Sequence, residues 1–152
     1  MVVTITVNGT KYTDDISPDL PLLDYVRSKG CLSVKRGCET SNCGLCTVHL
    51  DGKPVLSCSV LAVRANGRQV TTLEGLEEEA RAFGAFLADE GGEQCGFCSP
   101  GFIMNVLAMV HELDDPTDEE IREYLAGNLC RCTGYQSQLR AIRKYLTSKK
   151  EG

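Results

Sequence analysis

The most informative part of this 152-residue sequence is the loop Gly37-Cys38-Glu39-Thr40-Ser41-Asn42-Cys43-Gly44-Leu45-Cys46. It holds three cysteines in the pattern C-x4-C-x2-C, and Cys58 follows after eleven intervening residues. Cysteines at this spacing bind plant-type [2Fe-2S] clusters. Small and turn-forming residues let the loop wrap around a cluster and direct amide N–H groups at its sulfur atoms. We therefore predict that four thiolates hold a [2Fe-2S] cluster here: Cys38, Cys43, Cys46 and Cys58.

Four further cysteines form a second group. They are arranged as Cys95-x2-Cys98 and, after 31 intervening residues, Cys130-x-Cys132, and both pairs fall at ends of predicted helices. A helix that begins near Ser99 would offer free amide groups and the positive end of its dipole to an anionic cofactor. We predict that these four thiolates converge on a second negatively charged cluster.

Disulfides and zinc are the other uses of paired cysteines. Disulfides are disfavoured because the count of nine cysteines is odd, and because residues 1–7 alternate like a strand and do not resemble an export signal. We therefore expect a protein of the reducing cytoplasm. Structural zinc sites also use C-x2-C pairs, so a zinc-binding interaction module is the competing hypothesis, although the C-x4-C-x2-C triad fits zinc poorly. Cys31 belongs to neither group and is expected to be a small buried residue.

The first half of the sequence predicts strands. Two hairpins are expected, one at Asn8-Gly9 and one at Asp51-Gly52, because these dipeptides accept the positive φ angles of two-residue turns. A short helix can begin at Pro21, and residues 69–73 can form a closing strand. The pattern then becomes helical, which predicts an α+β chain with a β domain over residues 1–74 and about four helices over residues 75–152.

Capping residues place the ends of two of these helices. Ser99 can cap the helix that carries Phe102 and Val106. Thr117 and Glu120 can form a capping box, and Gly127 can end that helix in a left-handed conformation.

The charge of the chain excludes some classes of partner. The 21 acidic residues exceed the 16 basic ones, giving a formal net charge of −5. A surface of this charge repels the phosphate backbone of a nucleic acid. No stretch approaches the ~20 apolar residues of a membrane span. We expect neither nucleic-acid binding nor a membrane segment.

Three longer strings contain the cysteines: G-C-E-T-S-N-C-G-L-C-T-V (37–48), Q-C-G-F-C-S-P-G (94–101) and G-N-L-C-R-C-T-G-Y (127–135). Together, in this order, they resemble the iron-sulfur subunit of the xanthine dehydrogenase family of molybdenum hydroxylases. The resemblance covers nearly the whole chain. It implies a β-grasp, ferredoxin-like domain over residues 1–74 and a four-helix domain over residues 75–152, each with one [2Fe-2S] cluster.

The resemblance also implies partners. In such enzymes a molybdopterin cofactor on a large subunit oxidises the substrate, and electrons pass through the two clusters to FAD on a medium subunit. This chain would hold no catalytic residue, while Gln94 and Cys132 would lie near the molybdopterin. A dimer or higher multimer of heterotrimers is expected. Likeness to the bacterial xanthine dehydrogenases favours xanthine or hypoxanthine as substrate, with nicotinate, aldehydes or carbon monoxide as alternatives.

Two stretches depart from the pattern of the family. Ser41 stands where glycine is usual, so a serine must adopt a conformation that glycine accepts more easily, which could shift the potential of the first cluster. The residues Gln136-Ser137-Gln138-Leu139 replace a more apolar continuation.

Overall fold

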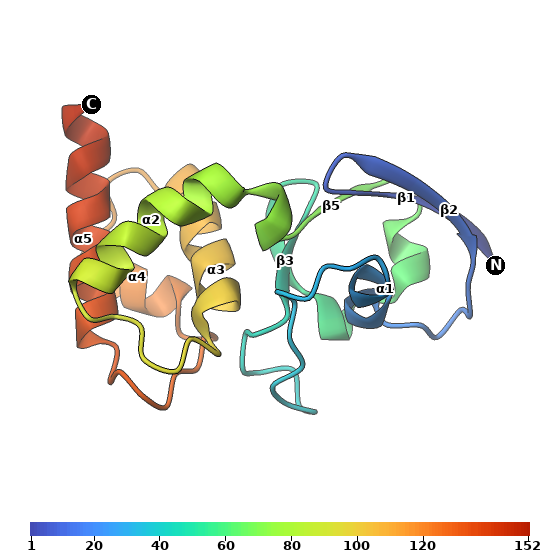
Figure 1. Cartoon of the computed structure of the whole chain (residues 1–152), viewed down its shortest axis with the longest axis horizontal. Coiled ribbons are helices and arrows are strands. Elements are labelled where there is room, and N and C mark those ends of the chain that lie inside the picture. The colour runs from blue at the N-terminus through green and yellow to red at the C-terminus, as the bar shows by residue number, and fades with distance from the viewer.

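The computed structural model describes residues 1–152 and shows an α+β chain with five strands in one sheet and five α-helices. The elements are β1 (Val2–Val7), β2 (Thr10–Asp15), α1 (Leu22–Ser28), β3 (Thr47–Leu50), β4 (Lys53–Leu56), β5 (Gln69–Thr71), α2 (Glu77–Asp89), α3 (Ser99–Glu112), α4 (Asp118–Tyr124) and α5 (Gln136–Glu151). Figure 1 shows the sheet and α1 at one end of the molecule, and α2 to α5 at the other. The α+β class is as predicted.

The sheet has the strand order β2-β1-β5-β3-β4. β1 pairs with β5 in parallel, and every other neighbouring pair is antiparallel. Both predicted hairpins are confirmed. Their turns have positive φ angles, 49° at Asn8 and 81° at Gly9 in the first and 50° at Asp51 and 80° at Gly52 in the second, which Asn, Asp and Gly tolerate best.

Two hydrophobic cores lie at the two ends. In the first, Val3, Ile5 and Val7 alternate along β1 and are at most 3% exposed, and they belong to one apolar cluster with Leu22 and Val26 of α1. Full burial of such a side chain contributes about 1.5–3 kcal/mol. The alternation of β1 therefore fixes which face of the sheet receives α1.

The second core joins all four helices of the C-terminal half. Phe83 of α2, Ile121 of α4 and Tyr145 of α5 are buried in it together with much of α3. The ring centroids of Phe83 and Tyr145 are 5.3 Å apart in an edge-on arrangement. None of the helices has the length and apolar character needed to cross a membrane.

The boundary predicted between residues 74 and 75 falls inside a 3-10 turn, Leu73–Gly75. The strand predicted over residues 69–73 ends earlier, at Thr71, because this turn begins at Leu73. The turn follows the last strand and precedes α2. Where one domain ends and the next begins stays a prediction.

The capping box of α4 is confirmed. The Glu120 N–H donates to the Thr117 hydroxyl at 3.3 Å, and the Thr117 N–H donates to the Glu120 carboxylate at 2.7 Å. The predicted left-handed end at Gly127 is wrong. α4 ends at Tyr124, its C-terminal capping residue Leu125 has φ −96°, and Gly127 lies beyond it without a positive φ.

The predicted cap of α3 is also wrong. Cys98 has helical angles (φ −80°, ψ −18°) and takes the capping position, so Ser99 becomes the first helical residue. The Ser99 hydroxyl is buried and has no hydrogen-bond partner in the chain. Pro100 lies in the first turn, as predicted.

The two halves meet where α3 packs against β3. The buried His49 ring in β3 shares a 2.7 Å hydrogen bond between its Nε2 and the Met104 carbonyl in α3. Nearby, Gly101 lies so close to the first cysteine loop that a Cβ there would come within 2.4 Å of the Gly44 carbonyl oxygen. Only glycine permits this approach, which brings the start of α3 against the loop.

Candidate metal centres

The first cysteine loop connects α1 to β3 and reverses direction at two residues with positive φ, Ser41 at 58° and Gly44 at 78°. This conformation directs backbone N–H groups at a thiol. The pKa of Cys38 is lowered to about 6. The main causes are hydrogen bonds from the backbone amides of Asn42 and Thr40, and hydrogen bonds from Cys43 contribute less. Such amides favour the thiolate, which is the form that binds iron.

The four sulfurs of the first group approach one another in two pairs. The side chains of Cys38 and Cys43 hydrogen-bond each other, as do those of Cys46 and Cys58. Burial raises the pKa of Cys46 to about 11. Cys38 and Cys58 are only partly buried, so the loop presents one part of the group to the surface.

A positive charge accompanies the first group. Arg36 pairs with Asp24 at 2.7 Å, and this hydrogen bond, with a smaller effect from Cys58, raises the pKa of the guanidinium. A fixed cation beside thiolates offsets part of their negative charge.

The second group shows the same pairwise arrangement. The sulfur atoms of Cys95 and Cys132 are 3.5 Å apart, and the side chains of Cys98 and Cys130 hydrogen-bond each other. Cys95 and Cys132 are exposed, whereas Cys98 and Cys130 are half-buried. Burial raises the pKa of Cys98 to about 12, while a hydrogen bond from the Phe97 amide is the main cause of a lowered pKa at Cys95.

The donor sets fit [2Fe-2S] clusters. Each group supplies four thiols in two pairs, as the two irons of such a cluster require. No three His, Cys, Asp or Glu side chains surround a common point suited to a single metal ion. Which metal these cysteines bind stays a prediction.

Backbone hydrogen bonds link the two groups. The Leu129 N–H donates to the Cys43 carbonyl at 2.9 Å, and Leu129 directly precedes Cys130. Asn128 supports this link, because its amide nitrogen lies 3.5 Å from the Gly44 carbonyl and 3.4 Å from the Gly101 carbonyl. Sequence reasoning missed the role of Asn128, although it stands inside the third cysteine string.

The remaining candidates lie as follows. Gln94 is exposed and directly precedes the exposed Cys95, so it lies on the side of the second group that includes Cys132. Cys31 is 5% exposed and accepts a 3.5 Å hydrogen bond from the Asn8 amide. It is a small buried residue, as expected.

Comparison with known proteins places these groups in a family. The family model "[2Fe-2S] binding domain" matches residues 72–143, and "2Fe-2S iron-sulfur cluster binding domain" matches residues 7–83. The chain is 43% identical over 144 residues to a xanthine dehydrogenase iron-sulfur-binding subunit of Escherichia coli O157:H7, covering 90% of this chain and 88% of that one. It is 39% identical over 146 residues to a nicotinate dehydrogenase small FeS subunit of Eubacterium barkeri, covering 94% and 93%.

The chain belongs to the iron-sulfur subunits of the molybdenum hydroxylase family. Solved structures agree with this assignment. The iron-sulfur subunit superposes on a chain of quinoline 2-oxidoreductase from Pseudomonas putida 86 with a TM-score of 0.89 and 35% identity, covering 100% of this chain and 97% of that one. It also matches aldehyde oxidoreductase from Desulfovibrio gigas, with a TM-score of 0.89 and 36% identity, but there it spans only 17% of the longer chain.

Proposed function

We propose that this iron-sulfur subunit relays electrons one at a time, from a molybdopterin site on a large subunit to FAD on a medium subunit. In this proposal Cys38, Cys43, Cys46 and Cys58 hold a [2Fe-2S] cluster in a β-grasp domain over residues 1–74. Cys95, Cys98, Cys130 and Cys132 hold a second one in a four-helix domain over residues 75–152. When bound, each cluster accepts and releases a single electron, whereas hydroxylation of a substrate yields two.

The observation that carries the proposal is the direct connection between the two cysteine groups. The Cys43 carbonyl accepts the Leu129 N–H at 2.9 Å, and the next residue is Cys130. One hydrogen bond and one short backbone segment therefore separate a ligand of the first group from a ligand of the second. We call this connection between Cys43 and Leu129 the joint. Close contacts among three residues stabilise it: Gly44, Gly101 and Asn128. Two independent structural metal sites would not need this connection between their ligands.

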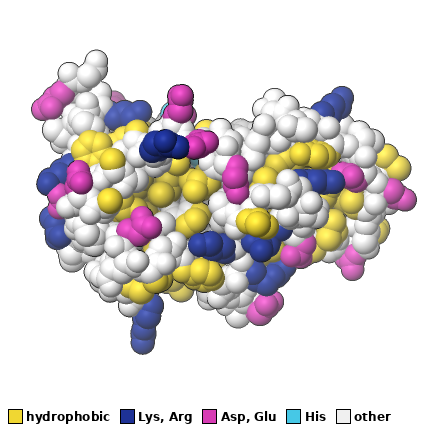
Figure 2. Space-filling model, viewed as in Figure 1, with side chains coloured by type: hydrophobic (Ala, Val, Ile, Leu, Met, Phe, Trp, Pro, Cys, Tyr) yellow, Lys and Arg dark blue, Asp and Glu magenta, His cyan; other side chains and the backbone are white.

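The surface around the second group suits a partner subunit. Phe97, Leu129 and Tyr135 flank its cysteines in sequence and are 50%, 49% and 44% exposed. Figure 2 shows hydrophobic side chains exposed over both halves of the molecule, with charged side chains interspersed. We place the molybdopterin subunit here, against Gln94 and Cys132, and the FAD subunit beside the first group. The proposed assembly is a cytoplasmic dimer or higher multimer of heterotrimers, and this chain contributes no catalytic residue.

The substrate is the least constrained part of the proposal. We propose purine hydroxylation, with xanthine or hypoxanthine as substrate. The relatives carry names that refer to xanthine, nicotinate and caffeine at 39–43% identity, so their names do not separate these substrates. Co-purifying the large subunit and comparing turnover of xanthine, nicotinate and an aldehyde tests this part.

Metal analysis of the chain isolated from its natural host tests the metal assignment. About four iron atoms and four sulfides per chain are expected from two [2Fe-2S] clusters. Zinc in place of iron would favour the interaction module and overturn the electron-transfer proposal.

A further inference from the structure

Gln138 is a polar residue in an apolar position. It lies in the first turn of α5 and is 2% exposed, and Ala141, Ile142 and Tyr145 follow it at helical spacing, all buried. The spacing places an amide where a hydrophobic side chain would continue the buried face. Because burying an amide is unfavourable unless it is hydrogen-bonded, its partners indicate why it is there.

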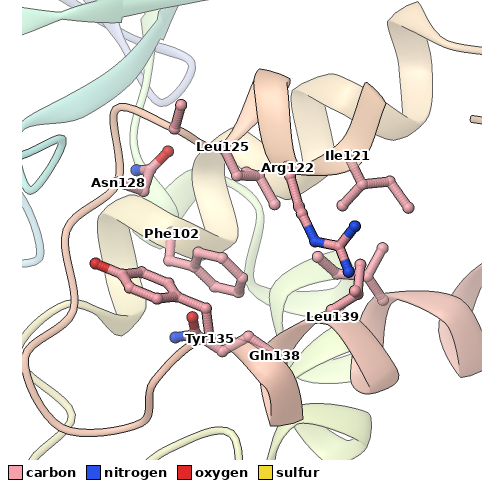
Figure 3. A pocket seen from close by; sticks show the side chains of 10 residues that line it. Phe102, Ile121, Arg122, Leu125, Asn128, Tyr135, Gln138 and Leu139 are labelled. Carbon is pink, nitrogen blue, oxygen red and sulfur yellow. The ribbon is translucent and has the colours of Figure 1, made fainter. Parts of the chain in front are cut away.

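The amide of Gln138 has one contact with the second cysteine group. Its nitrogen lies 4.0 Å from the Cys98 sulfur, and its oxygen is buried with no partner in the chain. A cavity of about 340 Å³ adjoins the residue, and Figure 3 shows Gln138 beside Tyr135 and Phe102 at its edge. The reverse orientation of the amide would turn the carbonyl oxygen towards a thiolate and repel it. The sulfur therefore selects the orientation in which the N–H faces Cys98.

Ser41 stands in the same relation to the first group. Its φ of 58° is unfavourable for a serine. The backbone conformation therefore does not account for a serine at this position, and the contacts of its hydroxyl are the place to look for a reason. Its hydroxyl oxygen lies 3.6 Å from the Cys58 sulfur and accepts the thiol proton. A thiolate bound to iron has no proton to give. The hydroxyl must then turn and donate to the sulfur instead.

We propose that Gln138 and Ser41 each donate a hydrogen bond to one ligand of a different cluster, Cys98 and Cys58, and raise the reduction potential of that cluster alone. The inference rests on the proposed function, since it requires clusters on these cysteines. Reduction adds negative charge to the sulfur ligands, so a donor stabilises the reduced form more than the oxidised form. The Ser59 hydroxyl, 3.6 Å from the Cys58 sulfur, and the Thr133 hydroxyl, 3.2 Å from the Cys130 sulfur, are further contacts that both variants leave in place. Because Gln138 and Ser41 act on separate groups, each shifts the difference between the two potentials independently of the other. This difference decides how an electron shared by the clusters is distributed.

Paired variants of the full chain, loaded with both clusters, test the inference. Gln138→Leu removes the donor and restores an apolar side chain, and Ser41→Gly removes the hydroxyl and relieves the backbone. The potential of each cluster is followed by redox titration with electron paramagnetic resonance. Gln138→Leu should disfavour reduction of the second cluster several-fold, where tenfold corresponds to ~59 mV for one electron. The reduction potential of the first cluster should not change. Ser41→Gly should lower the potential of the first cluster and leave the potential of the second cluster unchanged.

The control is Gln136→Leu, the same substitution on the same helix at an exposed position, which should move neither potential. A purely structural role for Gln138 predicts a changed unfolding temperature with unchanged potentials. Should Gln138→Leu fail to retain its second cluster, Gln138→Met, which keeps an unbranched side chain without an N–H, should give the same downward shift.

Unchanged potentials in Gln138→Leu and Ser41→Gly, with both clusters intact, would overturn the inference and leave the electron-transfer function standing. Absence of iron and sulfide from the unmodified chain would instead overturn the proposed function itself. The two failures are therefore distinct.

Discussion

Cys43 takes part in both the first cysteine group and the joint. Its side chain hydrogen-bonds Cys38, and its carbonyl accepts the Leu129 N–H. Cys43→Ser keeps the backbone carbonyl and removes the thiolate, so we expect loss of the first cluster and about half of the iron. The second cluster should remain reducible by dithionite. Electron paramagnetic resonance and iron counting check this, and loss of both clusters would show that the two halves do not fold independently.

The buried His49 gives a pH dependence to stability. Burial lowers its pKa below the usual 6.5, whereas the unfolded imidazole takes up a proton below about pH 6.5. The folding free energy contributed by this group is thus complete above that pH and declines as the pH falls, by at most ~1.4 kcal/mol per pH unit. His49→Leu should unfold with less pH dependence between about pH 7.5 and 5.5.

His111 supplies the matched control, because it is the other histidine and its side chain is 68% exposed. His111→Leu should follow the unmodified chain across this pH range in thermal unfolding monitored by circular dichroism. Equal pH dependence in all three proteins would show that His49 does not govern the acid side of the stability curve.

The start of α3 depends on the absence of a side chain at Gly101. A Cβ there would lie 2.4 Å from the Gly44 carbonyl oxygen and 2.9 Å from the Leu45 Cα, both backbone atoms. Gly101→Ala should therefore push α3 away from the loop and destabilise the chain by about 1–3 kcal/mol. Gly84→Ala in α2 has open space around the new Cβ and should instead stabilise the helix by about 0.5–1 kcal/mol. Denaturant unfolding checks both, and two equal effects would contradict the close approach.

Local elements were predictable because their signals lie within a few residues. The Asn8-Gly9 and Asp51-Gly52 turns and the Thr117 capping box are examples. The parallel pairing of β1 with β5 was not predicted, since it joins segments more than 60 residues apart. The cap of α3 was misplaced by one residue because Cys98 already has helical angles, whereas capping preferences favour the serine that follows it.

The whole molecule places the second cysteine group on the surface and ties it to the first through Asn128 and Leu129. The cysteine spacings predicted two groups of four, but not that a hydrogen bond would join them. That joint depends on Gly44 and Gly101, which are 57 positions apart in the printed sequence, and no local pattern reports such a contact. The departures at Ser41 and Gln138 could be seen in the sequence, but their nearness to Cys58 and Cys98 could not.

Gln94 tests the proposed orientation of this chain against its large subunit. Gln94→Ala should leave both clusters reducible by dithionite, because the residue is exposed and outside both cysteine groups. Reduction by substrate should slow by about tenfold or more if its amide contacts the pterin. Stopped-flow comparison of the two reductants separates these effects. Unchanged reduction by substrate would mean that the pterin binds elsewhere.

Electron paramagnetic resonance of the dithionite-reduced native complex, combined with iron, sulfide and molybdenum counting, tests the electron-transfer function most directly. We expect two distinct [2Fe-2S] signals in a complex that contains molybdenum. Bound zinc without a reducible iron signal would contradict the electron-transfer function and return the chain to a structural role.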